Sequence, residues 1–277
     1  MIREALNYPP SGEHGSRAVL VGGLLFVVLT AVGIVSWSLL RGDPPVVLVP
    51  VSVAAQWFSS TDVTVALIAV TVISFCIRIV LRGYYVTVLR ASTGETDPVA
   101  PPFSGVQSVV NGVIYIVVLF VYFLPAVLLC GFGLSIQLVS SPEMRGTLIN
   151  TVGAFAFLFG LFAFIAAAYL VPAAITLFAH ENSIRAAFDR STVHTCVLSE
   201  DYAVGWLLAK LMLFVLTPIA ILLQVVLVGF FLRFYLHVSV YTVYALAVTS
   251  ALDLTAEDVN GRNTTAEEEN TILSPTK

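Results

Sequence analysis

The sequence predicts an all-α protein, a polytopic bundle of about six transmembrane helices with short interfacial helices on the cytoplasmic side. Three observations predict this class. The 277 residues are 58% hydrophobic and only 11% charged, which is about half the charge of a soluble domain. Several apolar runs reach the roughly 20 residues needed to cross a bilayer, and none of the seventeen carboxylates falls inside them. Backbone within lipid must satisfy its own hydrogen bonds, so these runs are expected to be helices.

The apolar runs place the spans. Four runs stand apart, at residues 18–40, 63–81, 112–139 and 148–179. The first is too long for a signal peptide and ends without a small-residue cleavage site, so it is expected to remain as a span. The last run, 203–252, is long enough for two passes, and its polar residues favour a turn around 231–237. The sequence therefore predicts a six-span membrane domain over residues 1–252.

The lysines and arginines predict the orientation. With six spans, one side receives both termini and the second and fourth loops. That side carries ten of the thirteen basic residues, Arg3, Arg17, Arg78, Arg82, Arg90, Arg185, Arg190, Lys210, Arg262 and Lys277, against Arg41, Arg145 and Arg233 on the other. Because cytoplasmic loops are enriched in basic residues, both termini are expected in the cytoplasm, beneath the cell membrane.

The fourth loop, FAHENSIRAAFDRSTVH, is unusually polar for its position between two apolar runs. Asn182 can cap a helix start, Ile184 and Phe188 share one side, and Arg185 and Asp189 form an i,i+4 pair on another. This pattern predicts a short amphipathic helix in the headgroup zone. An ordinary solvated connector is the alternative. A similar brief helix is expected at 103–110 in the second loop.

The C-terminal residues 253–277 differ from the rest. They carry six acids and two bases and almost no large apolar side chains. Such a segment cannot bury enough surface to order itself. It is predicted to be a disordered, acidic, cytoplasmic tail.

Two features inside the predicted spans concern packing and bending. A strip of small residues in the fourth span recurs at three- and four-residue steps, which favours close helix packing in lipid: Gly153, Ala156, Gly160, Ala163 and Ala167. Three prolines interrupt the third, fourth and fifth spans and predict kinks: Pro125, Pro172 and Pro218. Kinked helices can build transporter sites, although neighbouring helices also tolerate such prolines.

The sequence offers little for catalysis. Its three cysteines and four histidines lack metal-ligand spacing, and no nucleophile elbow, phosphate loop or dinucleotide motif occurs. The basic residues are too dispersed for nucleic acid. Arg78 and Lys210 lie near predicted span ends, where their long side chains are expected to reach the headgroups. The expectation is therefore a protein that is not an enzyme and binds no cofactor or metal.

Several segments resemble the haloarchaeal domain-of-unknown-function 4013 family of membrane proteins. They are EALNYPP before the first span, VGGLL within it, RGYYVTVLR and PPF after the second, YLVPAAITLFAHENSIRAAFD around the fourth, and DYAVGWLLA at the fifth. The resemblance extends from Glu4 to about Asp253. It implies a haloarchaeal cell membrane, and it implies no activity and no catalytic residues.

Two functions remain open from the sequence. The first is a non-catalytic protein that organises the bilayer or binds a membrane or cytoplasmic protein partner. The second is a small transporter or permease component that uses the proline-kinked spans. Transport predicts a polar cavity reaching the middle of the membrane, lined by groups such as Asn150, Thr217 or Gln224, whereas the first function predicts a dry, packed bundle. The oligomeric state is left undetermined.

Overall fold

The computed structural model describes residues 2–10, 12–41, 60–94, 99–103, 105–139 and 148–273, and every regular element in these ranges is helical. In chain order they are α1 Ile2–Asn7, α2 Gly12–Arg41, α4 Ser60–Gly94, α5 Gly105–Val139, α6 Leu148–Glu181, η2 Ala186–Phe188, α7 Arg190–Leu198, α8 Glu200–Leu222, η3 Leu223–Val226 and α9 Val228–Leu273. The predicted all-α class is confirmed. Six helical segments of the described chain are long and apolar enough to cross a membrane: His14–Leu40, Thr64–Thr93, Gly105–Val139, Leu148–Glu181, Glu200–Val226 and Val228–Asp253.

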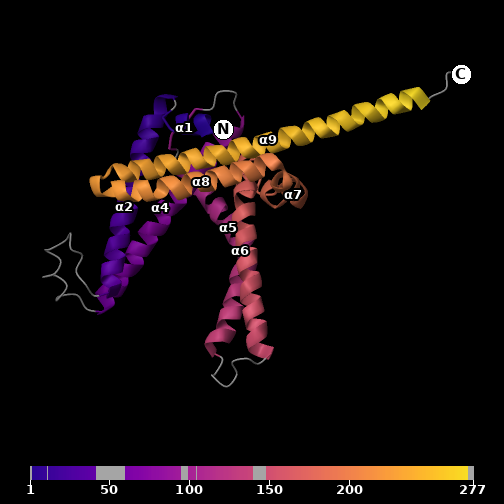
Figure 1. Cartoon of the computed structure of the whole chain (residues 1–277). Coiled ribbons are helices and arrows are strands. Elements are labelled where there is room, and N and C mark those ends of the chain that lie inside the picture. The colour runs from indigo at the N-terminus through magenta and orange to yellow at the C-terminus, as the bar shows by residue number, and fades with distance from the viewer. Residues whose placement is uncertain are drawn as a thin grey trace.

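The long helices form three pairs that do not share one direction. Figure 1 shows α2 beside α4 and α5 beside α6, with the two pairs diverging from a common end. The hairpin of α8 and α9 lies across that common end instead of running alongside the other four helices. The sequence predicts the six apolar segments but not this change of direction.

The contacts of α9 describe the crossing. Near its start, α9 packs Phe234 against Phe26 of α2, with ring centroids 6.5 Å apart. Two turns later, Tyr241 stacks on Tyr85 of α4 at 4.6 Å, and its hydroxyl lies 2.8 Å from that of Tyr115 in α5. The Phe234 ring also lies 5.6 Å from that of Tyr84 in α4, so α9 meets α2 and α4 near its start and α4 and α5 two turns later. About two thirds of the apolar segment of α9 is buried, against less than a quarter for each of the other five, so α9 forms the centre of the molecule.

Close backbone approach fixes the α4–α5 pair. A methyl group at Gly83 would lie 1.6 Å from the Ser108 carbonyl oxygen, and one at Gly112 would lie 2.0 Å from the Ile79 carbonyl oxygen. No side chain can occupy either position without separating the helices. Small residues allow this contact because packing, and not the hydrophobic effect, drives association between helices in lipid.

The turn between the last two apolar segments lies earlier than predicted. It falls at η3 and Leu227, whose φ of 63° places it in the left-handed region, and not at 231–237. The prediction was wrong because it treated Arg233 and His237 as residues that interrupt a span. Both lie within α9, where their side chains are partly buried.

The fourth loop also differs from the single amphipathic helix that the sequence predicts. Asn182 has a φ of 53° and ends α6, a position that favours asparagine or glycine. A 3-10 turn, η2, follows, and Asp189 then caps α7 by accepting from the Ser191 backbone N–H. A capping carboxylate in extended backbone ends one helix and starts the next, so the loop is divided in two. In the second loop, α5 begins at Gly105 and runs without a break into the third span, so no separate helix occurs at 105–110.

The C-terminal segment begins as a continuation of α9, and the predicted disorder of residues 253–277 stays a prediction. The helical backbone of α9 continues past Asp253 to Leu273 and extends away from the other helices toward the C-terminus (Figure 1). A helix that is already nucleated adds residues at low cost, and the Ala-Glu-Glu-Glu run at 266–269 is made of good helix formers. The last four residues of the predicted tail, 274–277, lie outside the described part.

Candidate functional site

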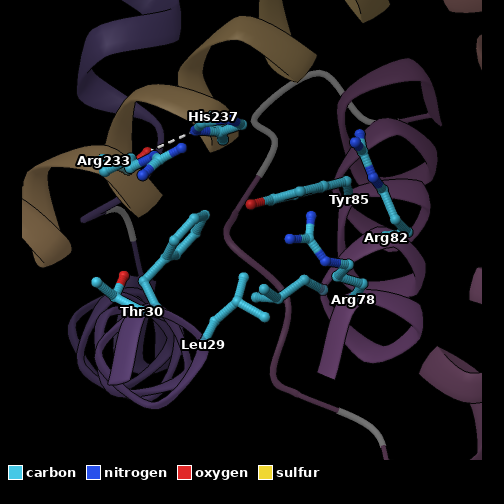
Figure 2. Close-up of a pocket in the computed structure, with 9 residues that line it drawn as sticks. Leu29, Thr30, Arg78, Arg82, Tyr85, Arg233 and His237 are labelled. Carbon is cyan, nitrogen blue, oxygen red and sulfur yellow. Dashed lines mark hydrogen bonds between the residues drawn. The ribbon is translucent and has the colours of Figure 1, made fainter. Parts of the chain in front are cut away.

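The most distinctive polar feature of the described chain is a cavity of about 260 Å³ between α2, α4 and α9 (Figure 2). Its wall combines apolar side chains with three guanidinium groups, an imidazole, a phenol and a hydroxyl. The lining residues are Phe26, Leu29 and Thr30 of α2, Arg78, Leu81, Arg82 and Tyr85 of α4, and Arg233 and His237 of α9. No carboxylate is among these nine residues. We refer to this space as the arginine cavity.

Of the two cavity arginines on α4, Arg78 lies nearer the middle of the helix. It lies near the midpoint of Ser60–Gly94, because this helix continues well beyond residue 81, where the sequence predicts the span to end. Its side chain is exposed, and the expected reach of its guanidinium to the headgroups stays a prediction. Figure 2 shows the guanidinium directed into the space between α4 and α2.

Arg82 is held by two phenols. Its Nη1 donates to the hydroxyls of Tyr241 at 2.8 Å and Tyr115 at 3.0 Å, and its Cζ lies 4.9 Å from the centre of the Tyr115 ring. These contacts orient the guanidinium by hydrogen bonding and by cation–π attraction. Both phenols are neutral, however, so the positive charge has no counter-ion in this network.

Two residues of α9, Arg233 and His237, line the cavity. The guanidinium of Arg233 lies 5.3 Å from the centre of the Phe26 ring, and its buried Nε has no hydrogen-bond partner. The Nδ1 of His237 is 2.7 Å from the Arg233 carbonyl oxygen. A carbonyl can only accept, so Nδ1 carries a proton and the imidazole is fixed in orientation.

Tyr85 supplies an unsatisfied hydroxyl at the centre of the cavity wall. The residue is only 2% exposed, and its ring is stacked on Tyr241 and His237. Its hydroxyl is buried without a hydrogen-bond partner and points into the cavity in Figure 2. A buried orphan hydroxyl costs about 1–3 kcal/mol. The cavity thus gathers positive charge and unused donors, an arrangement that attracts negative charge.

The residues that the sequence singled out lie elsewhere. In the small-residue strip, Gly153, Gly160 and Ala167 are buried, and Ala156 and Ala163 are half-buried. A methyl group on Gly153 would lie 2.7 Å from Ile136, and one on Gly160 would lie 2.6 Å from Cys130. The strip therefore faces α5. This is the more buried side of an otherwise exposed segment of α6.

The three prolines lie inside α5, α6 and α8, and none of these helices lines the arginine cavity. Pro125 and Pro218 contribute no polar contact to it, and the Pro172 carbonyl oxygen accepts from the Thr176 hydroxyl at 2.8 Å. Asn150, Thr217 and Gln224 are also absent from the lining. The structure therefore does not bring the kinks and these polar groups together in the described cavity.

The four residues assigned to the interfacial helix are all exposed: Ile184, Arg185, Phe188 and Asp189. The Phe188 ring stacks on Tyr122 of α5 at 5.8 Å, which attaches η2 to the bundle. Hydrogen bonds from the Thr192 hydroxyl and the Ser191 backbone N–H lower the pKa of the Asp189 carboxyl. The structure thus assigns Asp189 to the start of α7 and not to a pair with Arg185.

A signal for the arginine cavity is present in the sequence. Arg78, Arg82 and Tyr85 follow i, i+4, i+7 spacing, and Arg233 and His237 follow i, i+4 spacing, so each set occupies one face of a helix. Recognising the site required knowing that α9 crosses α4 at this level. Hydropathy alone does not contain that information.

The sequence is similar to a known protein family. Residues 66–229 match the family described as Protein of unknown function (DUF4013). The chain belongs to this family. The match includes Arg78, Arg82 and Tyr85 of the DUF4013 chain, whereas Arg233 and His237 follow it. No curated protein and no solved structure matches the chain significantly.

Proposed function

We propose that this DUF4013 protein is a non-catalytic membrane-organising protein, and that its α8–α9 hairpin lies along one leaflet of the bilayer. The observation that carries the proposal is the crossing of α2, α4 and α5 by α9. If α2, α4, α5 and α6 run through the membrane, a hairpin across their common end runs along its surface.

The side chains of α8 favour lipid on the outer face of the hairpin. Large apolar residues along its length are more than half exposed, namely Leu207, Leu211, Phe214 and Leu222. A continuous apolar patch of this kind marks contact with another apolar phase. Helices that insert into one leaflet respond to curvature and lipid composition. A hairpin anchored to four crossing helices would therefore couple local bilayer shape to the position of the protein.

The proposed location is the cell membrane of a haloarchaeal host, with both termini in the cytoplasm. The basic residues support this side for the termini. This orientation does not depend on whether the α8–α9 hairpin crosses the bilayer, because four or six crossings both return the chain to the side where it started. The helical extension of α9 beyond Asp253 would then enter the cytoplasm, where its acidic composition suits a membrane-associated or cytoplasmic protein partner with a basic surface.

Depth measurements test the position of the hairpin. Spin labels at residues 207, 211, 214 and 222 of α8 are compared with labels at 120, 124 and 128 of α5 in reconstituted vesicles. The proposal expects similar depths along α8 and a steady change of depth along α5. A depth maximum in the middle of α8 between two shallow ends would show that it crosses the bilayer, and would reject the proposal.

Vesicle shape tests the organising function itself. We expect increasing amounts of the protein to narrow the distribution of vesicle diameters seen by electron cryomicroscopy. A Leu211→Ser, Phe214→Ser variant is expected to lose this effect, whereas a Val127→Ser, Leu128→Ser variant, changed at exposed positions of α5, retains it. Identical diameters with and without protein would contradict a membrane-organising role.

A small transporter component is the second candidate, and the arginine cavity is the observation that favours it. A polar cavity near the midpoint of α4 is a feature of transport sites. The route would pass between α2, α4 and α9, and not through the proline-kinked helices. Proteoliposomes loaded with radiolabelled phosphate test it, since a transporter releases the label faster than a Tyr85→Phe variant does. Equal release from protein-free vesicles would exclude transport of this anion.

A further inference from the structure

We propose that the arginine cavity is a binding site for a phosphate group, carried either by a membrane lipid headgroup or by a soluble phosphate compound. The argument for this site does not rest on the proposed membrane-organising function. Four features of the cavity lead to it, namely uncompensated charge, converging donors, orphaned polar atoms and size.

Uncompensated charge comes first. Three guanidinium groups, Arg78, Arg82 and Arg233, line one space without a carboxylate among the lining residues. Arg78 is exposed, whereas Arg82 and Arg233 are partly buried, and a charge buried within a membrane domain costs several kcal/mol unless it finds a partner. Within the described part of the chain, the partners of two of these arginines are neutral aromatic side chains, Tyr115 and Tyr241 for Arg82 and Phe26 for Arg233. Like charges repel, so a bound anion is the group that makes this concentration of arginine stable.

The donors converge from two helices. Figure 2 shows Arg78 and Tyr85 of α4 on one side of the cavity and Arg233 of α9 on another. Guanidinium groups bind phosphate through two parallel N–H donors and remain charged at any physiological pH. An oxyanion with several equivalent oxygens can accept from both walls at once. A halide, with a single centre and no directed acceptors, would use this arrangement less well.

The third feature, two buried polar atoms without hydrogen-bond partners, is independent of the charge. The Tyr85 hydroxyl and the Arg233 Nε are both buried without a hydrogen-bond partner. Buried polar groups are nearly always paired, and here two of them belong to the wall of the same cavity. Both can donate, and an oxyanion in the cavity would satisfy both. The site is therefore built for an acceptor.

The cavity size restricts the class of ligand. Its volume of about 260 Å³ is slightly below the range of about 300–1,000 Å³ that is usual for small-molecule sites. This suits a phosphate with a small substituent, such as glycerol, better than a nucleotide. The apolar groups Phe26, Leu29 and Leu81 complete the wall and can contact the carbon atoms next to the phosphate.

The test measures binding to purified protein in a neutral detergent. Native mass spectrometry and thermal unfolding are followed with dioleoyl phosphatidic acid, with dioleoylglycerol, which lacks the phosphate, and with inorganic phosphate. Preferential retention of phosphatidic acid identifies a lipid source, and stabilisation by inorganic phosphate identifies a soluble source. Either result supports the site. A wild-type protein that retains dioleoylglycerol as well as phosphatidic acid and is not stabilised by inorganic phosphate overturns it.

Variants assign the binding to this cavity. Arg78→Gln and Arg233→Gln are each expected to weaken binding of the responding probe by about tenfold, the loss of one charge-assisted hydrogen bond. Arg17→Gln, an exposed arginine of α2 outside the cavity, is the matched control and should bind as the wild type does. If all three variants bind alike, the anion lies elsewhere and the proposal fails.

A Tyr85→Phe variant separates binding from folding. Its hydroxyl has no partner in the protein, so its removal should leave the unfolding temperature without ligand equal or higher. Binding of the probe should nevertheless weaken several-fold. An unchanged affinity together with an unchanged or raised unfolding temperature would show that the hydroxyl takes no part in an anion site.

Discussion

Replacing Gly112 by alanine should separate α4 from α5. The new methyl group would lie 2.0 Å from the Ile79 carbonyl oxygen, where ordinary contact begins at 3.4 Å, so the helices must move apart by about 1.4 Å. The obstructing atom belongs to backbone and cannot rotate away. Overpacking of this kind typically costs about 1–3 kcal/mol, and we expect the upper end of that range for Gly112→Ala.

Gly131→Ala is the matched control on the same helix. A methyl group there would meet nothing within 4 Å, and alanine is favoured over glycine in a helix by up to about 1 kcal/mol. The free energy of unfolding of both variants is measured by circular dichroism in mixed micelles. The two variants should therefore change stability in opposite directions. If Gly112→Ala unfolds at the same denaturant concentration as Gly131→Ala, the close α4–α5 contact is not present in the folded protein.

Three further predictions concern single groups. Asp189→Ala should loosen α7 more than Asp189→Asn, which keeps a capping acceptor. Hydrogen bonds lower the pKa of the Asp189 carboxyl from 3.8, so the stabilisation of α7 by this carboxylate is present above that value and is lost as the pH falls through the lower folded pKa. Hydrogen exchange of the α7 amides can follow this loss. Burial raises the pKa of the Cys196 thiol to about 11, so Cys196 should resist iodoacetamide at pH 8 in the folded protein and react after unfolding in dodecyl sulfate. Tyr241→Phe removes a hydrogen bond to Arg82 and should lower the free energy of unfolding by about 1.5–3 kcal/mol; a loss as large in an Arg82→Met background would show that this hydrogen bond is not the cause.

The sequence predicts the helical class and the apolar segments well because the bilayer imposes a local rule. A chain in lipid must be helical and must remain apolar for about 20 residues, and both properties can be read from a short window. The boundaries are less accurate. The second span was expected to end at residue 81, yet α4 continues to Gly94, since Tyr84, Val86 and Leu89 are buried by other helices and do not need lipid.

The direction of α8 and α9 could not be predicted in this way. Hydropathy depends on composition and does not report which way a helix runs. A weaker signal exists, because the apolar segment of α9 has the lowest hydropathy of the six, 1.4 against 2.3 or more, and is the most buried. A helix that contacts protein on most sides can carry Arg233, His237 and Ser239 at lower cost than a lipid-facing helix. Lower hydropathy in a segment of spanning length therefore indicates a central helix as readily as a turn.

The arginine cavity and the crossing of α9 depend on each other physically. The crossing places Arg233 close to Arg78 and Arg82, although these charges repel. Aromatic packing opposes the repulsion, since the centre of the Phe234 ring lies 5.6 Å from that of Tyr84 and 6.1 Å from that of Phe103. A ligand that binds only the folded state adds to this stability by mass action, by about 2.7 kcal/mol at a hundred times its dissociation constant. An anion in the cavity would therefore both neutralise the arginines and hold the hairpin across the bundle, so that occupancy of the site and the arrangement of α8 and α9 are thermodynamically linked.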